Sequence, residues 1–366
     1  CIRDSCSEAV KSALEDAGIE KNDIQAAWQG GPEMTEVSVG HSAISLSSAL
    51  KLPFIPATRV ENMCASGSEA LRGAAYAVAS GAYDICLALG IEKLKDTGYG
   101  GLPEFSHVIA VGTKLRIIMG NNTTPGLFAM MATSYFNAYG LSHDEGKALL
   151  GRIAIKNHHN GSLTPKAMLR NEITMEQYNK APIIAWPLGL FDSCGVTDGA
   201  AAAIICRSDL AKKIRPDPIK IKSIQICTTG YNGLIDPEYD FTYIKGTILA
   251  GKAAFAEAKV TDPRKEISVA NVHDCFTITE LVIYEDLGFS PRGRAKEDIE
   301  AGSFTLEGDL PVNTDGGLKC FGHPIGASGI RMIYEIYKQL QEKAGPRQIK
   351  NPTLGLTHNY GGHPPW

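Results

Sequence analysis

Hydrophobic positions at the start of the chain recur with a helical period. Val10, Leu14 and Ala17 fall on one face of residues 1–19, and Gly18 follows as a stop signal. This pattern predicts an opening helix. Two further elements are predicted after it, a short strand over residues 24–31 and a second helix over residues 41–50.

The stretch from Ala65 to Ala79 predicts a helix of a different kind. Its packing faces consist almost wholly of Ala, Gly and Ser, and Gly81 ends it. A helix with such small side chains can lie very close to its neighbours, as the central helix of a layered protein must. The apolar run that follows, residues 84–92, has the length of a strand covered on both faces.

The pattern changes over residues 95–190, where short amphipathic helices alternate with glycines, prolines and methionines. We interpret this region as an insertion that covers the core. Core strand resumes at residues 198–206, and a new strand is predicted to begin at residue 219. From there the strand–helix–strand order of the first part repeats. The pattern therefore predicts two architecturally duplicated halves, residues 1–210 and 211–366.

Composition and charge exclude several classes of protein. With a formal net charge of -4 over 366 residues, the chain carries no basic surface suited to nucleic acid. We find no apolar run of the roughly 20 residues that a membrane helix needs and no signal peptide at the start. The nine cysteines are odd in number and widely spaced, with no CxxC pair. They predict neither a disulfide framework nor a metal site, and they fit the reducing cytoplasm.

Cys64 stands directly before the predicted helix at 65–79. Free N–H groups and the dipole at a helix start favour a thiolate there. A small buried structural cysteine is the alternative. The residues Ala65, Ser66, Gly67 and Ser68 leave the surroundings of the thiol without bulk, which makes Cys64 a candidate nucleophile.

His273 and Cys275 belong to a short HDCF segment between an apolar strand and a helix. Because they are two residues apart, an extended backbone would project both to the same side. Asp274 would then point away, as a structural cap. Alone, this tetrapeptide is a weak signal.

His323 lies in a stiff, glycine-rich turn, GHPIGASG, between Gly322 and Pro324. Ser328 is suited to beginning the next helix. Either the turn positions this imidazole for chemistry, or His323 is a satisfied loop histidine.

A second glycine-rich segment, HNYGG, follows the last predicted strand, and its backbone amides can face a ligand without obstruction. We interpret two histidines here as structural: His358, the first residue of this segment, and His363, which directly follows it.

Together these segments resemble the thiolase superfamily. The resemblance rests on NMCASGSEALRGA, GRIAIKNHHNGSLTPKA, DSCGVTDGAAAAII, NVHDCFTITELVIYEDLGF and NTDGGLKCFGHPIGASG, in this order over nearly the whole chain. The HDCF and HNYGG forms are similar to sterol-carrier-type and archaeal-type thiolases. The resemblance implies an α/β thiolase fold, with two duplicated αβαβα-layered halves and a covering loop region at about 95–190.

The chain also departs from the family pattern. Many thiolases have a second catalytic cysteine in a C-terminal Cys-Gly motif, and Asn359 stands in its place here. In the sterol-carrier-type branch the HDCF cysteine is thought to substitute, which nominates Cys275. Relatives usually have one more strand at each end, so we expect the sequence to be trimmed.

The resemblance implies an acetyl-CoA C-acyltransferase. It would cleave a 3-oxoacyl-CoA with CoA, or run the reverse Claisen condensation, through an acyl group on Cys64. His323 would help form the thiolate, and His273 and His323 would hold the thioester oxygen. Cys275 would protonate the enolate and deprotonate incoming CoA. The backbone N–H groups of Cys64 and Gly361 would hold the acyl oxygen.

Coenzyme A is expected as a substrate, and no cofactor and no metal are expected. Lys156, His158 and Asn160 in the covering region are predicted to contact the pantetheine arm. Met130 and Met131 are candidates for lining the acyl pocket, although core packing is the commoner role of methionines on a helix.

The resemblance further implies a homodimer or a dimer of dimers and, as in some relatives, a small partner with a zinc ribbon and an OB-fold. Three alternatives stay open. The first is an aldolase-type lyase acting on a β-hydroxyacyl-CoA. The presence of Tyr360 beside the glycine pair favours this alternative. The others are another condensing enzyme, which would lack HDCF, and a non-catalytic acyl-CoA- or lipid-binding subunit.

Overall fold

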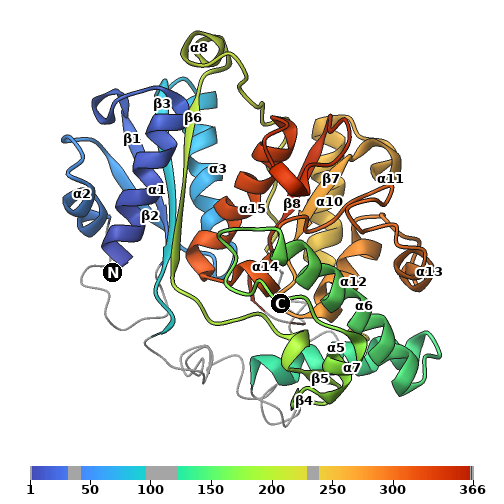
Figure 1. Ribbon diagram of the computed structural model, residues 1–366. Coiled ribbons are helices and arrows are strands. Elements are labelled where there is room, and N and C mark those ends of the chain that lie inside the picture. Colours follow the sequence, from blue (N-terminus) through green and yellow to red (C-terminus); the bar gives the residue numbers. More distant parts are fainter. Residues whose placement is uncertain (1, 32–42, 96–122, 229–238, 363, 365–366) are drawn as a thin grey trace.

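A four-stranded sheet forms the framework of the first half of the computed structural model (Figure 1). Its strands, in spatial order, are β2 (Ala57–Val60), β1 (Ala26–Gly30), β3 (Ile85–Glu92) and β6 (Gly199–Cys206). β1 runs parallel to β2 and β3, whereas β6 runs antiparallel to β3. The structure describes residues 2–31, 43–95, 123–228, 239–362 and 364.

Helices cover both faces of this sheet. α1 (Ile2–Ala17) packs on β3 and β6 from one side, while α3 (Ser66–Ala79) and α15 (Ile325–Leu340) pack on the other (Figure 1). The predicted helices at 1–19 and 65–79 and the predicted strand at 84–92 are confirmed within two residues. α2 (Ile44–Leu50) lies where the second helix was expected.

A smaller sheet lies on the other side of α15. It pairs β7 (Val269–Val272) in parallel with β8 (Gly355–His358), and α15 packs against both strands. α12 (Thr277–Asp286) follows β7 and is buried over its whole length beside α10 (Lys245–Ala258). α15 is thus a shared central layer between the two sheets.

The strand predicted to begin at residue 219 is not formed. Residues 215–228 have no assigned helix or strand. Ile and Lys alternate here, but Ile219 and Ile221 are 37% and 48% exposed and no described strand pairs with them. The division into halves at residue 210 stays a prediction.

The region expected at 95–190 is described from residue 123 onward; residues 96–122 lie outside the described residues. Its long helix α6 (His143–Ser162) begins at a capping box between Ser142 and Glu145. α6 packs against α12 and α14 (Gly317–Phe321). The region's other elements are α5 (Thr124–Ala138), α7 (Met175–Lys180), β4 (Ile183–Ala185), β5 (Leu188–Gly189) and η3 (Leu190–Asp192).

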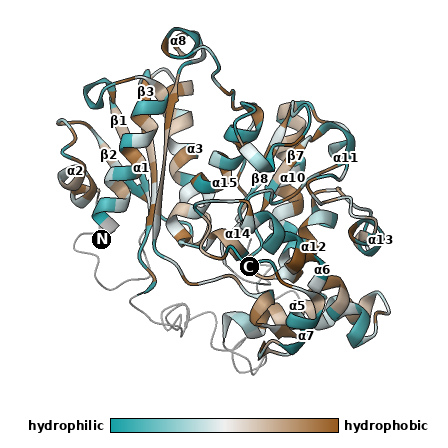
Figure 2. Cartoon of the chain, viewed as in Figure 1, coloured by the Kyte–Doolittle hydropathy of each residue, from teal (hydrophilic) through white to brown (hydrophobic). Residues whose placement is uncertain are grey.

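Polar and apolar residues are distributed as this layering requires. Figure 2 shows hydrophobic residues along β6 and α12, whereas α8 (Ser208–Ile214) mixes hydrophilic and hydrophobic residues. The remaining short helices are η1 (Lys21–Asp23), α11 (Pro263–Glu266), α13 (Ala295–Glu300) and η4 (Gly345–Arg347). Among the described residues, none of the helices combines the length and the apolar character that crossing a membrane demands.

Glycines allow α3 and α15 to cross at their first turns. A Cβ added to Gly67 would lie 2.7 Å from the carbonyl oxygen of Gly326, and one added to Gly329 would overlap the backbone nitrogen of Ser68. Only a glycine fits such a close approach of two backbones. The crossing therefore places the residues that precede both helices, Cys64 and His323, next to each other.

Candidate active site

Cys64 meets two histidines at the crossing of α3 and α15. Its Sγ and one ring nitrogen each of His273 and His323 all lie within 4.8 Å of one another, and all three residues are buried. Cys64 precedes α3, His323 precedes α15, and His273 follows β7. The structure therefore brings together three of the four predicted catalytic side chains from distant parts of the sequence.

The backbone before α3 is shaped to present the thiol. Met63 has a left-handed φ of 48°, which turns the chain sharply ahead of Cys64. The Ser66 hydroxyl donates to the Met63 carbonyl at 2.6 Å and accepts from the N–H of Asn62 at 2.8 Å. These bonds close a tight loop around Cys64.

The side chain of Ser328 fixes the His323 ring. Ser328 Oγ donates to the carbonyl of Pro324 at 3.0 Å, so it accepts a hydrogen bond from His323 Nδ1–H at 2.7 Å. The proton of the neutral imidazole is then on Nδ1, and Nε2 carries a lone pair. Nε2 has no partner within the described residues.

His273 is fixed in the same way by Asn359. The Asn359 amide donates from Nδ2 to the Cys64 carbonyl at 2.8 Å, which sets the orientation of the amide. Its Oδ1 therefore accepts from His273 Nδ1–H at 3.0 Å. His273 Nε2 is left as a second lone pair without a partner among the described residues.

Burial keeps both imidazoles neutral. Desolvation lowers the pKa of His273 to about 4, although its bond to Asn359 opposes the shift. Desolvation, His273 and Arg331 lower the pKa of His323 well below its usual value. The two rings stand edge to face, 5.2 Å apart. At neutral pH each Nε2 is therefore a proton acceptor and becomes a donor only after it takes up a proton.

Cys275, the fourth predicted catalytic residue, lies at the start of α12. It is buried, and its Sγ is 3.8 Å from Thr279 Oγ1. Burial raises the pKa of its thiol well above the usual value, and Cys194 and Cys64 raise it further. Cys275 is therefore a protonated thiol at rest.

Cys194 was not predicted as part of this region. Its backbone N–H donates to the carbonyl of Cys275 at 2.8 Å. Burial raises the pKa of Cys194 to about 12, with contributions from Asp274 and Cys64. It follows Ser193 in the motif DSCG, which was used only to recognise the end of the first half.

Asp274 caps α14, as the sequence suggested. Its carboxylate accepts from the backbone N–H groups of Leu318 at 2.6 Å and Lys319 at 3.2 Å. Asn157 donates a third bond at 3.0 Å. Burial and the nearby Glu280 nevertheless raise the pKa of Asp274 to about 7. This carboxyl joins the HDCF segment to the turn that carries His323.

Gly361 lies against the Cys64 loop. A Cβ at this position would lie 2.6 Å from the carbonyl oxygen of Asn62 and 3.3 Å from the backbone nitrogen of Ala65. Tyr360 beside it is buried, and its ring stands edge to face with that of His273 at 6.0 Å. The HNYGG segment thus forms one wall of the site.

The predicted CoA contacts on α6 form hydrogen bonds within the protein. Lys156 Nζ pairs with Glu280, donates to the carbonyl of Val312 at 2.9 Å and is largely buried. Asn160 Nδ2 donates to the carbonyl of Asn313 at 2.9 Å. Such partners fasten α6 to the second half, and a role in binding CoA stays a prediction for these residues.

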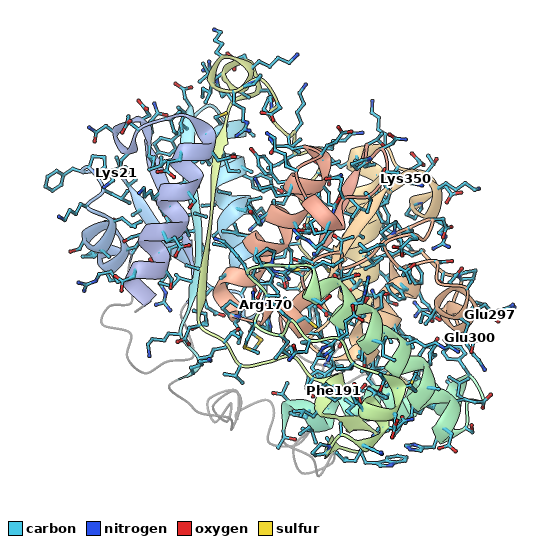
Figure 3. All side chains as sticks on the ribbon, viewed as in Figure 1. Lys21, Arg170, Phe191, Glu297, Glu300 and Lys350 are labelled. Carbon is cyan, nitrogen blue, oxygen red and sulfur yellow. The ribbon has the colours of Figure 1, made fainter. Side chains whose placement is uncertain are left out.

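His158 is likewise held inside the fold. Its Nδ1 bonds to the carbonyl of Asn171 at 2.9 Å, and its ring contacts that of Phe191, labelled in Figure 3, at 5.4 Å. Burial lowers its pKa to about 4. Met130 is half-buried on α5 beside the fully buried Met131.

His358 and His363 belong to or adjoin the HNYGG segment, and the sequence predicts a structural role for both. His358 Nε2 bonds to Thr247 Oγ1 at 2.9 Å, so this side chain ties β8 to α10. Burial and His273 lower its pKa to about 3. His363 lies outside the described residues.

Two family models match the chain. "Thiolase, N-terminal domain" matches residues 2–209, and "Thiolase C-terminal domain-like" matches residues 231–364. The acetyl-CoA acetyltransferase of Methanothermobacter thermautotrophicus is 37% identical over 99% of this chain and 91% of its own length. Sterol carrier protein 2 of Gallus gallus is 30% identical over 98% of this chain and 65% of its own length.

A solved structure shows the same fold. A protein described as Ltp2-ChsH2(DUF35) aldolase superposes with a TM-score of 0.83 and 24% identity. The match covers 99% of this chain and 91% of that one. It agrees with the α/β architecture that the motifs implied.

Proposed function

The chain belongs to the thiolase family, it has the thiolase fold and it is an acyltransferase, and from this premise we propose that it transfers acyl groups through Cys64. The reaction is the CoA-dependent cleavage of a 3-oxoacyl-CoA, or the reverse Claisen condensation. One observation carries the proposal: the Cys64 thiol and two imidazole nitrogens meet within 4.8 Å, and hydrogen bonds leave a lone pair on both Nε2 atoms.

Formation of the thiolate is the first step. His323 Nε2 accepts the proton of Cys64, and the helix dipole at the start of α3 stabilises the negative sulfur. Burial lowers the pKa of His323 and keeps the ring neutral at rest, so its Nε2 is in the form that accepts this proton. The protonated Nε2 is then a hydrogen-bond donor.

Cleavage of the carbon–carbon bond follows. The sulfur attacks the 3-oxo carbon, the bond between C2 and C3 breaks, and its electron pair passes to the thioester as an enolate. Protonated His323 donates to the enolate oxygen, and a water molecule that donates to His273 Nε2 holds the same oxygen. Cys275, which is protonated at rest because of its raised pKa, gives its proton to C2.

Incoming CoA completes the cycle. The Cys275 thiolate takes the proton of the CoA thiol, the CoA sulfur attacks the acyl group, and Cys64 leaves. The backbone N–H groups of Cys64 and Gly361 stabilise the acyl oxygen in both halves of the reaction. One such donor is worth about 3 kcal/mol in the transition state.

CoA enters this scheme as a substrate, and the acyl chain is left open. The family resemblance predicts that three residues of α6 contact the pantetheine arm of CoA, namely Lys156, His158 and Asn160. It predicts that Met130 lines the acyl pocket. The hydrogen bonds of Lys156, His158 and Asn160 within the protein favour a supporting role for these three residues, in which they hold α6 in place.

We extend the proposal to assembly and location. A homodimer or dimer of dimers follows from the family, and the two-part description of the aldolase neighbour supports a search for a small partner subunit. The cysteines in the described part of the chain form no disulfide, which fits the cytoplasm. Light scattering on the purified protein, alone and after co-expression with its genomic neighbours, tests both forms of assembly.

The decisive assay is thiolysis of acetoacetyl-CoA and a panel of bulkier 3-oxoacyl-CoAs. Cys64→Ser and Cys275→Ala are both expected to lose at least 100-fold in kcat. Cys206→Ala is the matched control. Strand β6 has its Gly199 end against Pro324, next to His323, and Cys206 lies at the opposite end of that strand, seven residues away. Full activity in Cys64→Ser would refute the acyl-Cys64 intermediate.

An aldolase-type lyase is the second candidate. Tyr360 favours it, because its phenol is buried beside His273. The presence of both Cys64 and Cys275 favours the thiolase. A Tyr360→Phe variant with full thiolysis, together with no cleavage of β-hydroxyacyl-CoA by the unmodified protein, excludes the lyase.

A further inference from the structure

The cluster of Cys64, His273 and His323 has the ligand set of a zinc site. Three protein ligands of the Cys/His type with one open position are typical of zinc centres that also bind water or substrate. In a tetrahedral zinc site with bond lengths near 2.1 and 2.3 Å, ligand atoms lie about 3.3–3.6 Å apart. Here the three candidate ligand atoms lie within 4.8 Å of one another, so small side-chain rotations suffice.

The surroundings of both histidines match those of metal ligands. A zinc-bound imidazole usually donates its second ring N–H to a neighbouring acceptor, which fixes the ring and its tautomer. His323 does so to Ser328, and His273 does so to Asn359. Each Nε2 is buried without a partner in the described part of the chain. Each ring therefore has a preset lone pair, and one nitrogen of each ring lies within 4.8 Å of the Cys64 sulfur.

From this geometry we propose that the protein binds one zinc ion through Cys64 Sγ, His273 Nε2 and His323 Nε2, with water in the fourth position. On binding, the thiol of Cys64 releases its proton to solvent and its sulfur forms a bond to the metal. The two imidazoles replace water molecules of the hydrated ion.

Bound zinc inhibits acyl transfer, because it draws electron density from the sulfur that would attack the substrate and occupies both nitrogens that would handle the proton. Zinc is therefore a reversible inhibitor of the resting form, and an acylated Cys64 does not bind it. This consequence rests on the proposed function, whereas the metal site itself does not.

Spacing along the sequence gave no hint of this site. The three ligands come from separate segments more than 40 residues apart, and no CxxC or HxxxH pattern marks them. Only the crossing of α3 and α15 and the docking of β7 bring them together.

Cobalt is the first probe, since its thiolate complexes absorb in the near ultraviolet and its tetrahedral complexes absorb in the visible. We expect one Co²⁺ per chain with both bands, and displacement of Co²⁺ by Zn²⁺. Cys64→Ala should lose the thiolate band and weaken zinc binding at least 100-fold, whereas Cys206→Ala should bind as the unmodified protein does. Ser328→Ala, which removes the partner of one ligand, should weaken zinc binding about 10- to 100-fold.

A second measurement guards against a misfolded variant. Zinc should protect Cys64 of the unmodified protein from iodoacetamide, as read by peptide mass spectrometry, and alkylation of Cys64 beforehand should abolish the cobalt bands. Absence of the thiolate band in the unmodified protein, or equal zinc affinity in Cys64→Ala, would overturn the proposal. Because these readouts do not use thiolysis, zinc binding without thiolysis would leave the metal site standing and count against the proposed function alone.

Discussion

Asn359 donates a hydrogen bond of 2.8 Å to the backbone carbonyl of Cys64, across 295 residues of sequence. The same amide accepts from His273. One side chain thus sets both the position of the nucleophile's backbone and the tautomer of a neighbouring imidazole. Asn359 is therefore a positioning residue, which acts through Cys64 and His273.

Substituting Asn359→Asp should damage the site without opening a cavity. A carboxylate oxygen would face the Cys64 carbonyl in place of the Nδ2 donor, and its charge would favour protonated His273. Loss of a buried hydrogen bond of this kind costs about 1–3 kcal/mol, so kcat for thiolysis should fall about 5- to 100-fold. A pH–rate profile distinguishes this role from a purely structural one, because the acid limb should move to higher pH. An unchanged limb would contradict the assigned tautomer.

Ser328→Ala should affect the chemical step more than substrate binding. Without its partner, His323 loses the hydrogen bond that places the proton on Nδ1. We expect kcat to fall by roughly 10-fold, since a positioned base contributes 100-fold or more in total, with KM nearly unchanged. Steady-state kinetics measure the split, and a change confined to KM would be inconsistent with a role through His323.

Gly329→Ala tests the helix crossing. The added methyl group would overlap the backbone nitrogen of Ser68 and force α3 and α15 apart. Overpacking of this kind costs about 1–3 kcal/mol, and it should lower both the unfolding free energy and the rate of thiolysis. Gly246→Ala, also within a helix, is the matched control, because its Cβ would lie 3.7 Å from the nearest atom. Denaturant unfolding and kinetics of both variants give the comparison, and equal behaviour would mean that the crossing is not tight.

His158→Gln should change how acid destabilises the protein. The folded state lowers the pKa of His158 from about 6.5 to about 4, so the unfolded state takes up a proton first as the pH falls. The stability due to the neutral buried ring is present above pH 6.5 and is lost progressively between 6.5 and 4. That loss amounts to about 3 kcal/mol and should be missing from the variant.

Urea unfolding at a series of pH values measures this difference. His159→Gln is the matched control, since the neighbouring side chain is half exposed. Other buried groups titrate in the same range, among them Asp286, whose pKa burial raises to about 7. For that reason the comparison is made between variants, and parallel curves for His158→Gln and the unmodified protein would contradict the assignment.

Local sequence patterns predicted the elements that depend on local chemistry. The helix at 65–79 was predictable because its Ala, Gly and Ser content is itself the reason it can pack so closely, and Gly81 ends it. The prediction of a strand at residue 219 was wrong, because alternation of apolar and polar residues does not by itself supply a neighbouring strand to pair with. Period-2 patterns specify a strand only where a sheet edge is available.

The meeting of Cys64, His273 and His323 agrees with the motifs, whereas the bonds around them were not predictable, and the catalytic roles stay predictions. Cys64, His273, His323 and Cys275 were recognised from motifs, but the partners that fix the two imidazoles are distant in sequence. Lys156 illustrates the same limit: a lysine on an amphipathic helix is expected to face solvent, and nothing near it predicts the buried carboxylate of Glu280, 124 residues away.

The span between Cys64 and Asn359 has a consequence for the making of the protein. During synthesis the first half emerges long before residue 359, and contacts of such long range form late. Until then no imidazole of the second half can reach the thiol, so Cys64 behaves as an ordinary cysteine on the nascent chain. The environment of Cys64 is therefore complete only once the chain has been made as far as residue 359.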